Sequence, residues 1–186
     1  SRRMRTAYEK CDFHIAYHDV HRFASVDLGG FYLDVLKDRL YCDQADSRAR
    51  RSAQTAFLII LKELTQLLAP ILVFTAEEIW EHLPEAVRTE QSVHHTTWQE
   101  LPAEYWDPEL DQHWDAFLEV RRVVSKGLEL ARGDKVIGAS NEAQVVIYAN
   151  EHYQSILNAF AADLKMLFIV SAVEIEPFQE GQDALY

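Results

Sequence analysis

The sequence predicts a mainly α-helical fold, a helical bundle followed by a small C-terminal α/β appendage. Up to about residue 131, apolar residues recur three to four positions apart, which is the spacing of one helix face. From Gln144 the pattern changes, because QVVIYA alternates and is rich in β-branched residues, as strands are. Hydrophobic residues make up 48% of the 186 positions, so the chain can bury a globular core.

The first third is predicted to form two helices separated by a glycine pair. Residues 4–24 carry Tyr8, Cys11 and Ile15 at helical spacing. Gly29 and Gly30 should weaken any helix between the two. The stretch FYLDVLKDRLYCD, residues 31–43, then gives a second helix with one apolar face. Its other face holds Asp34, Lys37, Asp38, Arg39 and Tyr41.

The clearest helical pattern runs from about Arg48 to Ala69. Asp46 or Ser47 is the expected N-cap, and Pro70 should end or kink the helix. Because this helix is apolar on most sides, we expect it to be central and buried. A short helix should follow, starting at Thr75, which has the capping-box spacing to Glu78, and closing at Pro84.

The second half is predicted to be a connection, a long helix and an α/β region. Residues 85–108 lack periodicity, and a helix then runs from about Leu110 to Ala131. A short helix over 152–164 and one or two strands over 166–176 complete the expected elements. The predicted organisation is therefore a bundle over 1–108, a long helix completing or linking it over 109–132, an α/β subdomain over 133–176, and a flexible tail over 177–186.

The charge is unevenly distributed along the chain. A formal net charge of −12 argues, as an average, against a nucleic-acid partner. However, residues 1–62 hold 11 Lys/Arg and 8 Asp/Glu, a net of +3, while residues 63–186 hold 7 and 22, a net of −15. The first third can therefore face a polyanion.

Targeting and redox signals point to an ordinary cytoplasmic protein. No run of about 18 uncharged apolar residues predicts a membrane span, and no apolar signal core follows the N-terminal arginines. Cys11 and Cys42 are too few for a disulfide framework, so we expect buried thiols in a reducing, cytoplasmic setting.

No catalytic or metal-binding constellation stands out. His14, His18 and His21 lie at i, i+4 and i+7, a spacing that can hold a metal, but no further ligand is evident. A polar helix face with half-buried imidazoles is the competing interpretation. The glycines form no phosphate loop, and no G-x-S-x-G motif occurs. We therefore predict no catalytic residue and no metal ligand.

A basic and aromatic corner is the main candidate for a binding site. Two groups flank the loop CDQADS, one ending a helix and one opening the next: Lys37, Arg39 and Tyr41, then Arg48, Arg50 and Arg51. Arginines at a helix N-terminus suit phosphate, and a tyrosine can stack on an unpaired base. The alternative is a charged corner whose arginines pair with Asp38, Asp43 and Asp46.

Several ordered segments carry a family resemblance. YEKCDFH, FYLDVLKDRLY, LLAPILVFTAEEIW and SVHHTTW resemble the anticodon-binding helical region of bacterial isoleucyl-tRNA synthetases. LELARGDKVIGASNEAQVVIY and LFIVSAVEI resemble the small α/β region that follows in that family, so the resemblance covers about residues 8–176. Pieces such as LLAPILVFTAEEIW are shared with valyl and leucyl relatives. Such a relative, or a helical protein-interaction module, remains an alternative.

The resemblance implies a part of a class I aminoacyl-tRNA synthetase, an AMP-forming isoleucine–tRNA ligase. This stretch would hold the anticodon stem-loop of tRNA-Ile, while a catalytic domain absent from this sequence uses ATP to charge the tRNA with isoleucine. The family's His-Ile-Gly-His and Lys-Met-Ser-Lys-Ser signatures and its C-terminal zinc cysteines are missing. We therefore expect an excised fragment without a catalytic centre or cofactor. ATP, Mg²⁺ and zinc are expected only in the full-length parent, which should be a cytoplasmic monomer.

The resemblance also ranks the candidate contacts. In related methionyl enzymes a base-stacking side chain lies near the end of the matching helix, which corresponds to the region of Arg39. The expected tRNA-binding residues are those of the corner, with two weaker candidates beyond it: Lys37, Arg39, Tyr41, Arg48, Arg50, Arg51, Arg22 and Lys135.

Overall fold

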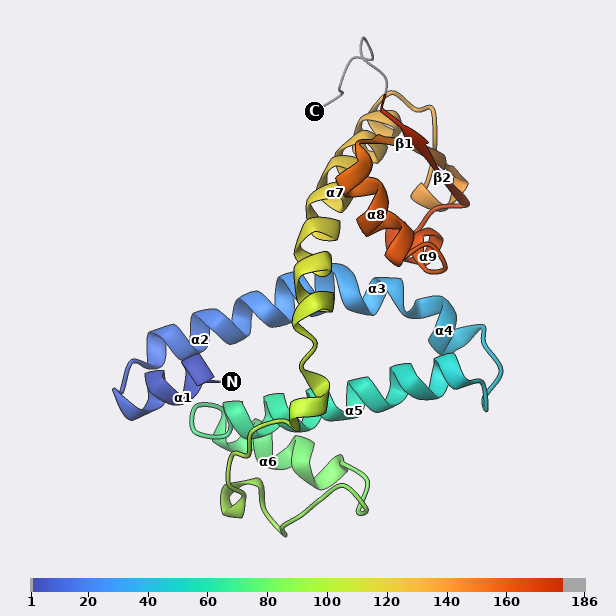
Figure 1. Ribbon diagram of the computed structural model, residues 1–186. Helices are drawn as coiled ribbons and strands as arrows, with labels where there is room; N and C mark the ends of the chain where they lie inside the picture. Colours follow the sequence, from blue (N-terminus) through green and yellow to red (C-terminus); the bar gives the residue numbers. More distant parts are fainter. Residues whose placement is uncertain (1, 179–186) are drawn as a thin grey trace. The chain divides into compact units, whose positions relative to one another are not determined.

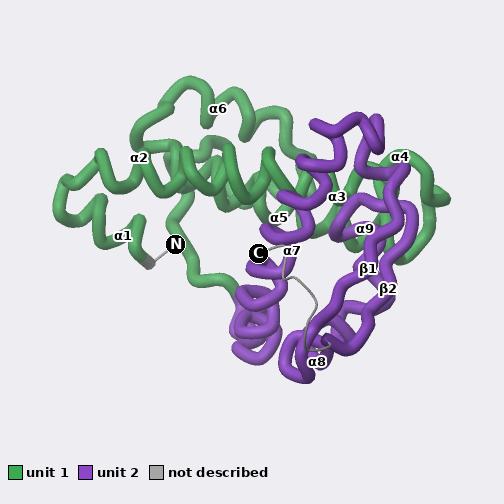
Figure 2. Tube along the Cα trace, turned by 90° about the horizontal axis from the view of Figure 1, so that it is seen from above, with its two compact units in different colours: residues 1–101 green, residues 102–186 purple. Residues whose placement is uncertain are grey.

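The chain forms two compact units, residues 1–101 and residues 102–186, which Figure 2 shows in different colours. The structure is a computed structural model that describes residues 2–178. Unit 1 is helical, and unit 2 combines helices with a two-stranded sheet, so the mainly α fold with a small α/β region is confirmed (Figure 1).

Unit 1 begins with two helices instead of the single helix predicted over residues 4–24. Helix α1 (Arg2–Glu9) ends where Cys11 adopts a left-handed conformation, with φ 59°. The amide of Asp12 donates to the carbonyl of Ala7 at 2.7 Å, and that of Cys11 to Tyr8 at 3.0 Å, a Schellman closure with cysteine in the usual glycine position. The chain then restarts as α2 (Phe13–Arg22).

The glycine pair does not interrupt the helical path, contrary to the prediction. Residues Phe23–Tyr32 form a π-helix, η1, which continues directly into α3 (Leu33–Val35) and α4 (Lys37–Tyr41). A Cβ at Gly29 would lie 3.1 Å from the carbonyl oxygen of Ala24, five residues back. Glycine therefore permits the close backbone approach of this segment.

Helix α5 (Arg48–Leu68) returns beside the α2–η1–α3 path and has the predicted bounds (Figure 1). Ser47 is its N-cap, because its side chain accepts a hydrogen bond from the amide of Arg50. Near its C-terminal end, Leu64, Leu67 and Leu68 pack against the cluster of α1 and α2. The expectation of a buried helix is wrong, since many of its apolar side chains are only half-buried and Leu61 is exposed.

Helix α6 (Val73–His82) and the irregular connection after it close the end of unit 1. The helix begins two residues before Thr75, so the predicted capping box does not cap it. Trp80 is fully buried against Ala69, Ala76, Leu83 and Val93, and its indole donates to the carbonyl of Glu90 at 3.0 Å. The connection contains a short 3-10 turn, η2 (Val93–His95).

Unit 2 contains the long helix predicted from the second half of the sequence. A 3-10 turn, η3 (Ala103–Tyr105), precedes α7 (Pro108–Gly133), whose N-cap Asp107 accepts from two backbone amides and whose first residue is proline. On α7, Phe117 is fully buried and packs with Trp114, Phe160 and Phe168.

The sheet of unit 2 is one parallel pair. Strands β1 (Gln144–Ala149) and β2 (Ala172–Pro177) pair in register from Gln144 with Ala172 to Ala149 with Pro177. A 3-10 turn, η4 (Ser140–Glu142), precedes β1, and helices α8 (Glu151–Ala159) and α9 (Leu164–Phe168) form the crossover. Of the stretch 166–176, predicted as one or two strands, residues 166–168 are therefore helical and the later part forms β2. Of the expected tail, Pro177 belongs to β2 and residues 179–186 lie outside the described residues.

Candidate nucleic-acid interface

The corner between α4 and α5 is a tight turn held by its own backbone. The amides of Cys42 and Asp43 both donate to the carbonyl of Asp38, at 2.8 and 3.2 Å, which closes α4. The amide of Ser47 donates to Gln44 at 3.0 Å, and the Ser47 hydroxyl then caps α5. These hydrogen bonds fix the conformation of the loop and thereby the backbone positions from which the flanking basic side chains extend.

Arg50 holds this loop from within the helix. Its Nη1 donates to the backbone carbonyl of Asp43 at 2.9 Å, and its Nε is buried without a hydrogen-bond partner. The Ser47 hydroxyl also donates to the Asp43 carboxylate at 3.4 Å. Arg50 is thus partly committed to the structure of the loop, a role that its sequence position did not reveal.

Lys37 is also engaged within its own helical segment. Its ammonium group donates to the Asp34 carboxylate at 2.5 Å, three residues earlier. This hydrogen bond and the negative charge of Asp34 raise the pKa of Lys37. Because the lysine side chain is well exposed, the pair leaves Lys37 accessible while neutralising part of its field.

The remaining corner residues differ in how open they are. Tyr41 is 81% exposed at the end of α4, and Arg48 and Arg51 are exposed on the first turn of α5. Arg39 is half-buried. Burial raises the pKa of the Tyr32 hydroxyl, and the positive charge of Arg39 partly opposes that rise. Tyr32 in turn packs against Phe57 of α5. Arg39 therefore lies closer to the body of unit 1 than Tyr41 does.

The structure brings six of the eight predicted residues to this corner. The two weaker candidates lie elsewhere. Arg22 is exposed at the end of α2, with η1 and α3 between it and α4, and Lys135 follows α7 in unit 2. Lys135 has a left-handed backbone, with φ 60°, and donates its amide to Arg132, so it closes α7 as Cys11 closes α1.

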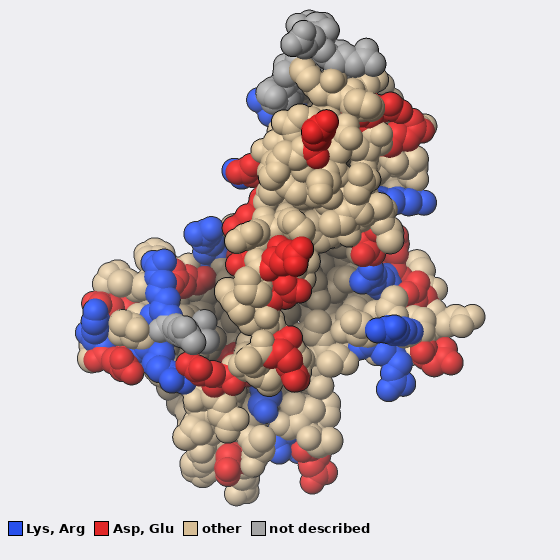
Figure 3. All heavy atoms as spheres, viewed as in Figure 1, with Lys and Arg blue, Asp and Glu red and all other residues tan. Residues whose placement is uncertain are grey.

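The alternative of a fully paired charged corner is wrong for the three arginines of α5. Among residues 2–178, no ion pair joins Arg48, Arg50 or Arg51 to Asp38, Asp43 or Asp46, and Arg50 uses only a backbone carbonyl of Asp43. Residues 34–51 hold five Lys/Arg and four Asp/Glu. On the face shown in Figure 3, blue and red atoms lie side by side at the end of unit 1 that carries α4. The corner offers unpaired guanidinium groups within a mixed surface.

The histidine and cysteine candidates form no site within the described residues. His14, His18 and His21 are exposed, and the ring of Tyr17 packs with those of His18 and His21 at 5.4 and 5.7 Å between centroids. No group of three or more His, Cys, Asp or Glu side chains in the described chain could hold a metal ion. Both cysteines are exposed free thiols, so the expectation of buried thiols is wrong.

The mainly helical fold agrees with what the chain matches among known proteins. Residues 2–147 match the family described as the anticodon-binding domain of tRNA ligase, which covers most of both units. The chain belongs to this family.

The relatives that the chain matches over nearly its whole length are isoleucine–tRNA ligases. It is 47% identical over 174 residues to the one from Natranaerobius thermophilus, 49% over 174 residues to that of Syntrophotalea carbinolica, and 43% over 178 residues to that of Geobacillus kaustophilus. These matches cover 94%, 93% and 95% of this chain but 19% of each relative. The resemblance read from the sequence is confirmed, and the chain spans about a fifth of the length of these ligases. No helix of the described chain is long and apolar enough to cross a membrane.

Proposed function

We propose that this chain holds the anticodon stem-loop of tRNA-Ile as part of an AMP-forming isoleucine–tRNA ligase. The observation that carries the proposal is the family match over residues 2–147, together with relatives named isoleucine–tRNA ligase that match over more than nine tenths of the chain. These names favour the isoleucine enzyme over the valyl and leucyl alternatives. The rest of the ligase chain supplies ATP-dependent aminoacylation, and this chain contributes no catalytic group.

The cofactors and setting follow from the same proposal. ATP with Mg²⁺ and the C-terminal zinc belong to the parts of the ligase that this chain does not span. The parent acts as a monomer in the cytoplasm, with tRNA-Ile and the remainder of its own chain as partners.

The residues of the α4–α5 corner have different roles in binding, according to how exposed each side chain is. Arg48 and Arg51 are exposed and unpaired among the described residues, and they contact phosphates beside the unsatisfied amides at the start of α5. Tyr41 stacks on an unpaired loop base, with Arg39 beside it. Arg50 and Lys37 add positive charge while they shape the loop and the helix end. Arg22 and Lys135 are peripheral contacts.

The test is a titration of the chain with the tRNA-Ile anticodon stem-loop at several salt concentrations. Replacing Arg48 and Arg51 together by alanine should weaken binding about tenfold or more at low salt. It should also lower the slope of log affinity against log salt by about 1.5, since each phosphate contact contributes about 0.7 to 0.9. A Lys10→Ala/Lys165→Ala variant removes the same charge from exposed positions away from the corner and serves as the control. Equal binding by the two double variants would show that the corner is not the site.

A further inference from the structure

Unit 1 contains a polar hollow between α5 and the connection that follows α6. We call it the α5 hollow, and its lining includes Lys62, Glu63, Gln66, Thr89, His95 and Thr97. All of its lining residues carry charged or hydrogen-bonding groups. Its volume is about 240 Å³. That is the room of about eight water molecules, so the hollow can also take one small planar ring system.

The walls of the hollow are fixed by hydrogen bonds from two tryptophans. The indole of Trp80 in α6 donates to the carbonyl of Glu90 at 3.0 Å, and the indole of Trp98 donates to the carbonyl of Gln66 at 3.0 Å. Between these two points Val93 is buried in the cluster around Trp80. The connection is therefore held on both sides of the hollow, which limits the cost of ordering the site when a ligand binds.

Gln66 has a buried side chain that lacks a partner. It is 7% exposed, and within residues 2–178 its amide group makes no hydrogen bond, since Trp98 uses only its backbone carbonyl. A buried amide costs stability unless something bonds to it. The same side chain also lines a second hollow, beside His94 and Trp98. The amide therefore faces space that water or a ligand can occupy.

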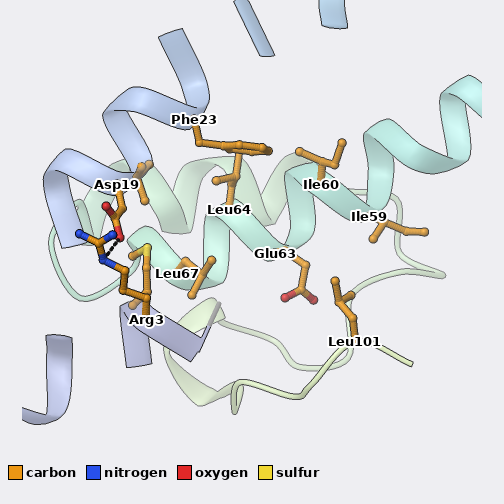
Figure 4. Close-up of a pocket in the computed structure, with 11 residues that line it drawn as sticks. Arg3, Asp19, Phe23, Ile59, Ile60, Glu63, Leu64, Leu67 and Leu101 are labelled. Carbon is orange, nitrogen blue, oxygen red and sulfur yellow. Dashed lines mark ion pairs between the residues drawn. The ribbon is translucent and has the colours of Figure 1, made fainter. Parts of the chain in front are cut away.

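The lining combines charges of both signs. Figure 4 shows the apolar groove between α2 and α5, where Leu64 points toward Phe23 and the Glu63 carboxylate points away from both. Burial raises the pKa of the Glu63 carboxyl, and the charge of Lys62 partly opposes that rise. With Glu90, the hollow holds two carboxylates and one ammonium group. A neutral ligand rich in N–H donors suits this balance better than an anion does.

We propose that the α5 hollow binds one unpaired nucleobase of the RNA and favours the amino-bearing bases adenine, guanine and cytosine over uracil. A carboxamide presents a donor and an acceptor side by side, as the edge of a base does. The Gln66 amide pairs with that edge, and the Glu63 carboxylate accepts from the amino group. Uracil has no amino group, and the carboxylates repel its two carbonyls.

The proposal rests on the chain binding tRNA, but it uses a surface other than the α4–α5 corner. From Arg48 to Glu63, α5 advances by about 20 Å. The base in the hollow therefore belongs to another part of the RNA than the one that meets Arg48. A charged metabolite fits less well, because its phosphate or carboxylate would enter beside Glu63 and Glu90. A base enters alone and leaves its phosphate outside.

The first test uses nucleosides and does not depend on tRNA binding. Adenosine, guanosine, cytidine and uridine are added at millimolar concentration while NMR follows the backbone amides of residues 62–66 and 95–99. The first three should shift these amides and bind about threefold to tenfold more tightly than uridine, the effect of one or two neutral hydrogen bonds. No shift with any nucleoside overturns the proposal, whether or not the chain binds the stem-loop. Equal binding of all four overturns the preference for an amino group.

Gln66→Met removes the amide with little change in volume. Because the parent amide lacks a partner, this variant should resist urea at least as well as the parent does. It should weaken nucleoside binding about threefold to tenfold. Gln91→Met, exposed in the same connection and outside the hollow, should not. Nucleoside binding by Gln66→Met at parental affinity overturns the role given to Gln66.

Complete tRNA-Ile distinguishes a base of the RNA from a free nucleoside. Gln66→Met should weaken tRNA binding about threefold to tenfold without changing its salt dependence, since no charge is removed. The variant that replaces both Arg48 and Arg51 by alanine should lower the salt dependence and keep the nucleoside shifts. Parental tRNA binding by Gln66→Met, with nucleoside binding lost, overturns the assignment to RNA and makes a free nucleoside the ligand.

Discussion

Under the proposed function, base recognition at the corner depends on Tyr41. Its ring is 81% exposed, whereas Arg39, two residues earlier, is half-buried. An aromatic ring held at the end of a short helix loses little further freedom when a base stacks on it. The exposed ring therefore makes Tyr41 a better platform than Arg39, to which the family resemblance pointed.

Replacing Tyr41 by alanine should weaken anticodon stem-loop binding about tenfold, since stacking of one base contributes about 1–3 kcal/mol. Tyr41→Phe keeps the ring and should bind within about twofold of the parent. The salt dependence should stay unchanged in both, because no charge is removed. Phe74→Ala, which removes an 89% exposed ring on α6, is the control. Binding by Tyr41→Ala at parental strength would exclude stacking at this position.

Glu63 gives the chain a pH-dependent weakness. Burial raises the pKa of its carboxyl above the ordinary value, so the folded chain holds this proton more tightly than the unfolded chain does. Stability therefore falls as pH rises through the acid range above the ordinary pKa, and is regained as pH falls.

Glu63→Gln should accordingly be more stable than the parent at pH 7.5, by up to about 0.5 kcal/mol, the usual size at a half-exposed position. The difference should shrink as pH falls toward 4, because the parent carboxyl then takes up its proton. Urea unfolding at the two pH values measures it, with Glu81→Gln as the comparison. A difference that is the same at both pH values would show that the carboxylate charge is not its cause.

At the scale of the element, the π-helix η1 is the segment that departs most from ordinary helix geometry. It joins α2 to α3 without a break and buries none of its residues. The Cβ position of Gly29 meets a backbone oxygen at 3.1 Å, whereas Gly127 in α7 has nothing within 4 Å. Two helical glycines thus have opposite surroundings, which makes them a matched pair.

Gly127→Ala should stabilise the chain by about 1 kcal/mol, because alanine is the better helix former and its methyl group meets open space. Gly29→Ala should give no such gain and should destabilise, since the carbonyl of Ala24 belongs to the same rigid segment. Chemical denaturation of both variants decides the matter. If both substitutions stabilise equally, the backbone around Gly29 has an ordinary α-helical register in solution.

Two helix starts with local signals were predicted to within a few residues. Ser47 caps α5, and Asp107 with Pro108 opens α7 near the predicted start, because a cap depends only on the residues around it. Cys11 ends α1 in a conformation that glycine usually adopts, so composition gave no sign of the break. Thr75 and Glu78 have capping spacing, but contacts of α6 with the rest of unit 1 let the helix start earlier.

At the scale of the whole molecule, the basic corner was predicted as a set of residues but not as a division of roles. Charge and spacing brought Arg48, Arg50 and Arg51 together on one helix turn, which the structure confirms. Arg50 donates to the carbonyl of Asp43, whereas Arg48 and Arg51 remain exposed. This difference depends on the conformation of the loop before α5. The half-exposure of α5 likewise depends on which segments pack against it. Hydropathy predicts that the helix should be covered but does not identify the segment that covers it.

The connection between the two units is the most open part of the described chain. Every residue from Leu101 to Gln112 is exposed, across the boundary between residues 101 and 102. Unit 1 holds 12 Lys/Arg and 15 Asp/Glu, a net of −3, whereas unit 2 holds 6 and 15, a net of −9. Most of the charge that repels RNA therefore belongs to unit 2, while the corner lies in unit 1.

Limited digestion with a glutamate-specific protease should cut first at Glu104 or Glu109, because cleavage requires an exposed and locally open backbone. Mass spectrometry should find one product ending at either residue, and circular dichroism should show that it keeps its helices. The product carrying unit 1 should bind the anticodon stem-loop at least as tightly as the whole chain at low salt, since it has lost a net charge of about −9. A faster cut within residues 48–68 would contradict the division into two units. Loss of binding by a folded unit 1 would instead indicate that essential contacts lie in unit 2, where Lys135 is the candidate.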